Sequence, residues 1–158
     1  MILGIVSDTH SLVLPQKLLE GLKGSDLIVH AGDLCDNSVL KILKSIAPLK
    51  AVQGNMDDAV LKKKLPLREV FEAGGVKIGV YHGHGLTRDA LANAREQFKQ
   101  DSVDVVIFGH SHQPFNQKIG ATLYFNPGSP NDAVRAPYFS YGLIEIINGR
   151  IKPAIIKI

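Results

Sequence analysis

The sequence predicts an α/β fold in which two mixed β-sheets pack face to face as a sandwich, with helices on the outside. Valine and isoleucine occur in short runs that are separated by charged segments. The first half alternates strand and helix patterns, which indicates parallel strands, and the second half is rich in hairpin signals, which indicate antiparallel strands. A length of 158 residues is typical of one domain, and we expect that domain to span residues 1–158.

In the first half, an apolar strand is followed by alternating helices and strands. Pro15 suits the first turn of a helix because its missing N–H would be unpaired there in any case. Apolar residues at helical spacing, Val39 to Leu43, predict the next helix. The segment 58–67 is weakly patterned, and we interpret its three lysines, Lys62 to Lys64, as a solvated face. The expected strands are 2–6, 27–29 and 49–52, the helices are 15–22 and 38–45, and 12–14 is a connector.

In the second half, glycine turns separate short apolar runs. Gly74-Gly75 and Gly120 each predict a hairpin, and Asn148-Gly149 is typical of a type I′ turn. A helix is expected over 87–97, with Thr87 as its N-cap and Leu91 facing the core. The expected strands are one around Phe71 and those at 76–81, 105–108, 115–119, 122–125, 141–147 and 151–156.

Composition narrows the classes of function and the compartment. The formal charge of +3 permits an anionic substrate but provides no basic face for a long nucleic acid. Cys35 is the only cysteine, which excludes an intrachain disulfide and favours a reducing compartment. The apolar N-terminus lacks the basic region of a signal peptide, and no apolar run reaches membrane-spanning length. We therefore expect a cytoplasmic protein with no membrane contact.

Polar side chains follow five of the predicted strands at the point where each strand ends. Ligands of α/β sheets bind beyond the carboxyl ends of the strands, so we expect these side chains to meet at one edge. Carboxylate, amide and imidazole groups together suit Mn²⁺, Fe²⁺ or Zn²⁺, and the groups are too many for one ion. Two such ions about 3.5–4 Å apart form a clamp for in-line phosphoryl displacement. The side chains are Asp8 and His10, Asp33, Asn55, His82 and His84, and His110 and His112.

The same residues, in this order, resemble the motifs of the calcineurin-like metallophosphoesterase superfamily. The motifs are Asp8-Thr-His10, Gly32-Asp33, Gly54-Asn55, His82 and Gly109-His-Ser-His112. The short chain and the Asn126-Pro-Gly-Ser129 segment are similar to the small single-domain prokaryotic phosphodiesterase branch. The resemblance implies an αββα sandwich with the metal site at the C-terminal ends of strands. It also implies two metal sites, the first held by Asp8, His10 and His112, the second by Asn55, His82 and His110, with Asp33 as the bridge.

The resemblance further implies a phosphodiesterase reaction. Two divalent metal ions are expected, with Mn as the first choice and Fe, Zn, Ni, Co or Mg as alternatives. A hydroxide that bridges them would attack phosphorus in line, and Asn55 could add a hydrogen bond to its role as a ligand. His84 is a candidate to orient a ligand or protonate the leaving oxygen, and a purely structural role for it is an equal alternative.

Met56 departs from the family pattern. Many relatives have Gly-Asn-His at this point, where the histidine contacts the phosphate and can protonate the leaving group. A thioether carries no such proton, and proton transfer by a placed group contributes roughly 10²–10⁴-fold. We therefore expect a small phosphodiester as the substrate and weak or no phosphomonoesterase activity.

Two other functions remain open. One is a non-catalytic metal-binding scaffold or interaction module, for which a retromer subunit of the same fold is the family precedent. The other is a nuclease or cyclic nucleotide phosphodiesterase of the same superfamily, although the modest charge disfavours long nucleic acids. A homodimer is possible through the region around Tyr138-Phe139. We interpret His30 as a packed histidine or a partner to a ligand, Asn126 as an anchor of its loop, and Cys35 as a bystander.

Overall fold

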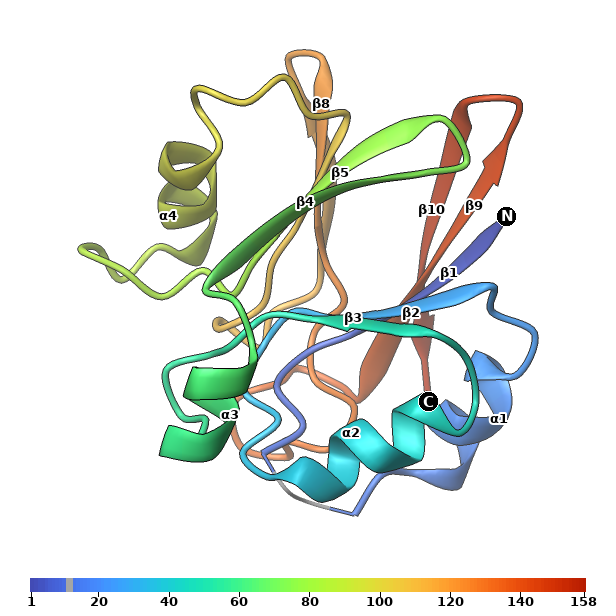
Figure 1. The fold of residues 1–158 in the computed structure, drawn as a ribbon, viewed down its shortest axis with the longest axis vertical. Coiled ribbons are helices and arrows are strands. Elements are labelled where there is room, and N and C mark those ends of the chain that lie inside the picture. The colour runs from blue at the N-terminus through green and yellow to red at the C-terminus, as the bar shows by residue number, and fades with distance from the viewer. Residues whose placement is uncertain (11–12) are drawn as a thin grey trace.

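Two five-stranded sheets face each other in the computed structural model, which describes residues 1–10 and 13–158 (Figure 1). The predicted connector at 12–14 lies partly outside the described residues. Both sheets are mixed, and helices lie on their outer faces. The predicted sandwich is confirmed.

The first sheet has the strand order β10-β9-β1-β2-β3. The neighbouring strands β1, β2 and β3 are parallel to one another. Val6 of β1 lies opposite His30 of β2, and His30 lies opposite Ala51 of β3. This register aligns their carboxyl ends, so the loops that follow them start side by side. The bounds are β1 Ile2–Val6, β2 Leu27–His30, β3 Leu49–Ala51, β9 Ser140–Ile147 and β10 Arg150–Lys157.

The second sheet has the order β4-β5-β6-β8-β7. The hairpins β4–β5 and β7–β8 are antiparallel as predicted, but β5, β6 and β8 pair in parallel. The second half is therefore antiparallel only within its hairpins, because the sequence of a hairpin does not determine which of its two strands pairs with the next segment. The bounds are β4 Arg68–Ala73, β5 Val76–Tyr81, β6 Val105–Ile107, β7 Phe115–Ile119 and β8 Thr122–Asn126.

The main core lies between the two sheets. Leu3, Ile5 and Val29 of the first sheet pack with Ile107 and Phe125 of the second, and all five are fully buried. Alternating strand residues point into this layer, as the pleat of a strand requires. The core thus fixes the two sheets relative to each other and brings their carboxyl edges together.

The outer faces are covered by helices. The helices α1 (Gln16–Leu22) and α2 (Asn37–Lys44) pack on the first sheet, and α4 (Ala90–Gln97) packs on the second, where Leu91 contributes as predicted. The short helix α3 (Ala59–Lys64) lies in the weakly patterned segment and was not predicted. Aspartates cap three of these helices, and Asp89, not Thr87, caps α4. Among the described residues, no helix has the length and apolar character to cross a membrane.

Candidate metal centre

Loops from both sheets are joined by hydrogen bonds at one edge of the sandwich. The Asp8 amide donates to the Gly32 carbonyl at 3.0 Å, and the Gly109 amide donates to the His82 carbonyl at 2.9 Å. The His110 amide crosses between the sheets and donates to Asp8 Oδ2 at 3.0 Å. The predicted convergence of the strand ends is confirmed.

The backbone of these loops is strained. Among the described residues, seven that are not glycine have positive φ, and six of them lie in these loops. Such conformations cost about 1–3 kcal/mol each and cluster at functional sites. The six are Asp8, His10, Asp33, Cys35, His110 and His112.

The strain separates the two histidines of the His-x-His motif. An extended loop would direct both rings to one side, but His110 and His112 have φ values of 68° and 57°. The His112 ring lies against His10, with ring centroids 4.9 Å apart, whereas His110 packs edge-on to His82 at 5.2 Å. The two rings therefore reach different parts of the site.

Close approach of the loops depends on two glycines. A Cβ at Gly54 would lie 2.1 Å from Asp33 Oδ1, and one at Gly109 would lie 1.9 Å from the Ser7 Oγ. Neither gap can accommodate a methyl group. The glycines of the Gly54-Asn55 and Gly109-His110 motifs are thus required for the carboxylates to sit where they do.

Asp8, His10 and His112 form one group of possible metal ligands. His112 Nε2 lies 3.3 Å from Asp8 Oδ1 and 3.1 Å from His10 Nε2, and His10 Nε2 lies 3.9 Å from the same carboxylate. Asp8 is fully buried, and His112 is almost so. Three potential donor atoms therefore face one small volume, as the predicted first metal site requires.

Asp8, Asp33 and His82 form a second group. His82 Nδ1 lies 2.8 Å from the Ala31 carbonyl, which can only accept, so Nδ1 carries the proton. The fully buried Nε2 makes no hydrogen bond within the described chain, although Asp33 Oδ2 is 3.2 Å away and Asp8 Oδ1 is 3.9 Å away. This nitrogen faces two carboxylates, an arrangement that needs positive charge between them, either a proton on Nε2 or a metal ion. The residues therefore fit a divalent metal ion.

Asp33 also extends toward the first group. Its Oδ2 is 4.0 Å from His10 Nε2, and its Oδ1 accepts a hydrogen bond from the Met56 amide at 2.8 Å. Asp8 likewise has contacts in both groups. Each carboxylate is consequently near histidines of both groups.

Asn55 and His110 lie beside the two groups but outside them. His110 adjoins His82 through its ring, and Asn55 is exposed in the loop after β3. The Asn55 carbonyl accepts from Lys62 Nζ at 2.7 Å. The lysines of α3 are exposed as predicted, but Lys62 is tied to a site loop, which sequence reasoning missed.

The buried charges shift the pKa values of these groups in opposite directions. Burial by itself would raise the pKa of Asp33, but the facing His82 and the Met56 amide lower it to about 2. Burial would lower the pKa of His82 and of His112, but the facing carboxylates raise both. Without a metal ion, protons on these two histidines therefore balance the carboxylates, which is the balance that metal ions would replace.

Asp132 was not among the predicted site residues, yet it contacts a predicted ligand. Its Oδ2 lies 2.5 Å from His112 Nδ1, on the far side of the ring from the cluster. Metal-binding histidines commonly use such a carboxylate to fix their tautomer and orientation. The sequence signal was weak: an Asn-Asp pair two residues after the Asn-Pro-Gly-Ser segment.

The loop that begins at Asn126 holds the other site loops in place. Asn126 Nδ2 donates to the Gly109 carbonyl at 2.9 Å, and the Ser129 hydroxyl donates to the Asp8 carbonyl at 2.8 Å. The predicted anchoring role of Asn126 is confirmed. His30 is also a packed partner of the ligand loops, since its ring accepts from the Gly32 amide and contacts the Thr9 hydroxyl.

His84 and Cys35 lie at opposite sides of the cluster. The His84 ring stands between Tyr81 and His82, at centroid distances of 5.4 and 5.5 Å, and burial together with nearby histidine charges lowers its pKa. Cys35 Sγ is 3.5 Å from His10 Nδ1, and burial among carboxylates raises the pKa of its thiol to about 12. The thiol therefore contacts the His10 nitrogen that points away from His112.

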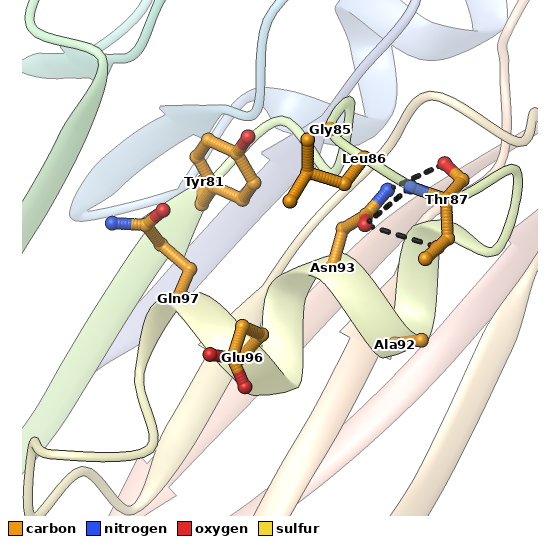
Figure 2. Close-up of a pocket in the computed structure, with 8 residues that line it drawn as sticks. All are labelled: Tyr81, Gly85, Leu86, Thr87, Ala92, Asn93, Glu96 and Gln97. Carbon is orange, nitrogen blue, oxygen red and sulfur yellow. Dashed lines mark hydrogen bonds between the residues drawn. The ribbon is translucent and has the colours of Figure 1, made fainter.

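Two hollows lie along the loops that carry the site residues. The larger, of about 660 Å³, lies over α4, where Asn93 accepts hydrogen bonds from the amide and hydroxyl of Thr87 and so fixes the loop after His84 (Figure 2). The smaller, of about 330 Å³, is lined by His10 and Met56 together with Asp132, Val134 and Arg135. Of these two hollows, only the smaller shares a lining residue, His10, with a ligand group.

The chain matches the calcineurin-like phosphoesterase superfamily domain over residues 1–149. A probable metallophosphoesterase of Methanocaldococcus jannaschii is 39% identical over 135 residues, which cover 82% of this chain and 68% of that protein. A phosphodiesterase of the same archaeon is 29% identical over 143 residues, or 81% of this chain and 83% of that protein. The protein therefore belongs to the calcineurin-like phosphoesterase superfamily.

Solved structures agree with this assignment. Wild-type Vps29 of Entamoeba histolytica in complex with Zn²⁺ superposes with a TM-score of 0.75 and 28% identity, covering 99% of both chains. A novel archaeal phosphodiesterase superposes with a TM-score of 0.81 over 99% of this chain and 100% of that one, and its 23% identity bears on the fold alone.

Proposed function

We propose that this protein is a metal-dependent phosphodiesterase with two divalent ions, of which Mn²⁺ is the expected kind. The observation that supports it most is the buried His82 Nε2, which faces the Asp33 and Asp8 carboxylates without a hydrogen bond in the described chain. Family membership supports phosphoester chemistry, and a relative named as a phosphodiesterase supports the diester.

The proposed ligand sets divide the cluster between two ions. Asp8, His10 and His112 would hold one ion, and His82, His110 and Asn55 would hold the other. Asp33 would bridge, which is supported by its position between His82 and His10. When bound, two such ions supply a nucleophile of lowered pKa and positive charge for in-line displacement at phosphorus.

The remaining residues would orient these groups and the substrate. Asp132 and the Ala31 carbonyl hold the outer nitrogens of His112 and His82. Asn55 is exposed at the rim, where its amide could donate a hydrogen bond to a phosphoryl oxygen as well as act as a ligand. His84 remains a proposed orienting group or proton donor, although its lowered pKa favours the neutral ring and the orienting role.

Hydrolysis by metal-stripped protein tests the proposal. Bis-p-nitrophenyl phosphate and p-nitrophenyl phosphate are compared with and without Mn²⁺, using wild type, Asp33→Asn and the remote control Asp104→Asn. We expect Mn²⁺-dependent diester cleavage in wild type and control, with a loss of at least about 10²-fold in Asp33→Asn. Equal activity in Asp33→Asn, or activity that ignores the metal, would refute it.

Met56 gives a more specific prediction about the ester type. Because its thioether cannot donate a proton, wild type should cleave the diester well and the monoester weakly. Met56→His should raise kcat on the monoester by about tenfold or more, since an imidazole would stand beside His10 in the same hollow. No gain on the monoester would remove the role that we assign to this position.

A non-catalytic metal-binding protein is the second candidate function. Its support is the likeness to Vps29, whose single mutant from Entamoeba histolytica superposes with a TM-score of 0.81 at 26% identity over the whole of this chain. Stoichiometric metal binding without hydrolysis of either ester would favour it. The proposal also includes a cytoplasmic setting, and it leaves a short or cyclic nucleotide as substrate and a homodimer to be tested with the same protein preparation.

A further inference from the structure

We propose that the smaller hollow is a specificity subsite for one ester group of the substrate, and that it takes a group with an apolar body and an anionic end. The inference rests on the proposed function, because it assumes a phosphoryl group at the metal centre. The hollow shares His10 with the first ligand group, so a phosphoryl group held there would lie at its inner end. Its volume of about 330 Å³ is at the lower end of the range for ligand pockets.

The walls of the hollow are apolar and unusually open. Met56 is 58% exposed and Val134 is 92% exposed, although each stands beside a buried ionic cluster. Contact with the apolar part of a ligand would remove the surfaces of these side chains from water, which is favourable. An aryl or similar apolar ester group could cover both at once.

Arg135 supplies a cation to the hollow. Arg135 is exposed, and within the described chain its guanidinium makes no hydrogen bond or ion pair. The acidic side chain in the hollow, Asp132, is engaged elsewhere: its Oδ2 faces His112 and its Oδ1 accepts from the amides of Val134 and Arg135 at 2.8 and 3.1 Å. The free cation therefore favours an anionic end on the ester group.

The segment that carries the subsite is fixed to the metal centre. Asp132 holds the amides of Val134 and Arg135 with one oxygen and His112 with the other. Gln113, the residue after His112, donates from Nε2 to the Arg135 carbonyl at 2.7 Å. The Asp132 carboxylate thus fixes both the His112 ring, a proposed metal ligand, and the backbone that carries Val134 and Arg135. The subsite is therefore formed before a ligand binds.

The test uses phosphonates, which have a P–C bond in place of the ester bond and are not hydrolysed by phosphoester cleavage. Methylphosphonate, phenylphosphonate and 4-phosphonobenzoate are titrated into Mn²⁺-loaded protein by calorimetry. Phenylphosphonate should bind about tenfold more tightly than methylphosphonate, because the ring covers the apolar walls. The added carboxylate of 4-phosphonobenzoate should contribute about another threefold through Arg135.

Three variants separate the contributions. Arg135→Gln should abolish the gain from the carboxylate and leave the phenyl preference, whereas Arg135→Lys should retain part of the gain. Val134→Ser should reduce the phenyl preference by about threefold and leave the carboxylate gain. The control Arg95→Gln, which changes an exposed arginine on α4, should bind as wild type does.

Equal affinity for the three phosphonates, no binding of any of them by metal-loaded protein, or an Arg135→Gln variant that keeps the carboxylate gain would overturn the subsite. Failure of the proposed function has a different signature. Protein that shows the predicted order of affinities but hydrolyses no diester would keep the subsite and lose the phosphodiesterase.

Discussion

At the scale of single residues, the site is defined by ionisable groups that are buried and depend on one another. Asp8 and His82 are fully buried, and Asp33 and His112 nearly so. Isolated charges at such depth are costly unless they are paired. The cluster therefore has two stable forms: one with protons on the histidines and one with metal ions in their place.

This competition predicts a pH dependence of metal affinity. The raised pKa values of His82 and His112 mean that both keep their protons in the metal-free protein above the pH at which a free histidine loses its own. Mn²⁺ must displace these protons, so affinity should rise by about tenfold or more from pH 6 to pH 8. Calorimetric titrations in buffers of different ionisation enthalpy would measure proton release. A Mn²⁺ affinity that does not change between pH 6 and pH 8, with no proton release, would contradict the account.

The candidate ligands could be located from the sequence because each follows an apolar strand. Asp8, Asp33 and His82 needed only strand patterns and the edge at which parallel strands end. Asp132 could not be found in this way, since its contact with His112 depends on how the loop after β8 folds back. The positive φ of His110 and His112, which turns their rings in different directions, is likewise not evident from residue type.

At the scale of elements, the loops can meet only where side chains are absent. Gly109 lies two residues after the strand β6 and passes directly over Ser7 and Asp8. A glycine is therefore required immediately before the His-x-His motif, because any side chain there would collide with Ser7 and Asp8.

Gly109→Ala should disturb both stability and metal binding. The new Cβ would lie 1.9 Å from Ser7 Oγ and 2.6 Å from Asp8 Oδ2. We expect the free energy of unfolding to fall by about 1–3 kcal/mol and Mn²⁺ affinity to fall by at least about tenfold. Urea unfolding followed by circular dichroism and calorimetry would measure the two effects.

Gly149→Ala serves as the control, because no atom lies within 4 Å of its Cβ. Its φ of 74° predicts a cost of about 1–2 kcal/mol from backbone strain, with unchanged Mn²⁺ affinity. Mn²⁺ affinity that falls equally in both variants would show that general destabilisation, and not the contact with Asp8, is responsible.

Most elements could be predicted from periodicity, and the exceptions have local causes. The helix α3 has six residues and buries only Leu61, so its sequence shows no apolar stripe. The helix α4 begins at Ala90 because Asp89 accepts from the Ala92 amide, while Thr87 is bonded to Asn93. Threonine is a common N-cap residue, but here the Thr87 hydroxyl donates to the Asn93 side chain, a contact that local sequence patterns do not reveal.

At the scale of the molecule, the sandwich core holds the two halves of the site together. Asp8, His10 and Asp33 follow strands of the first sheet, while His82, His110 and His112 follow strands of the second. The core between the sheets therefore sets the distances between these groups. The sequence predicted two mixed sheets but not the parallel β5-β6-β8 arrangement, since the β7–β8 turn does not reveal which strand faces β6.

A core substitution far from the site should separate stability from metal binding. Ile146 lies on β9 and packs on Gly74 of the opposite sheet, at the end of the sandwich where the chain starts. Ile146→Ala should lower the free energy of unfolding by about 2–5 kcal/mol. Mn²⁺ affinity of the folded protein should change by less than about twofold. A large loss of affinity would show that the site is coupled to the whole core.

The central claim is that this edge of the sandwich holds two metal ions with Asp33 between them. The most direct test is a titration of Mn²⁺ into metal-stripped protein, with the ions per chain counted for wild type, Asp33→Asn and Asp104→Asn. We predict two ions for wild type and for Asp104→Asn, and a loss of at least one ion or of about 10²-fold in affinity for Asp33→Asn. One ion or none in wild type, or two tightly bound ions in Asp33→Asn, would contradict the account.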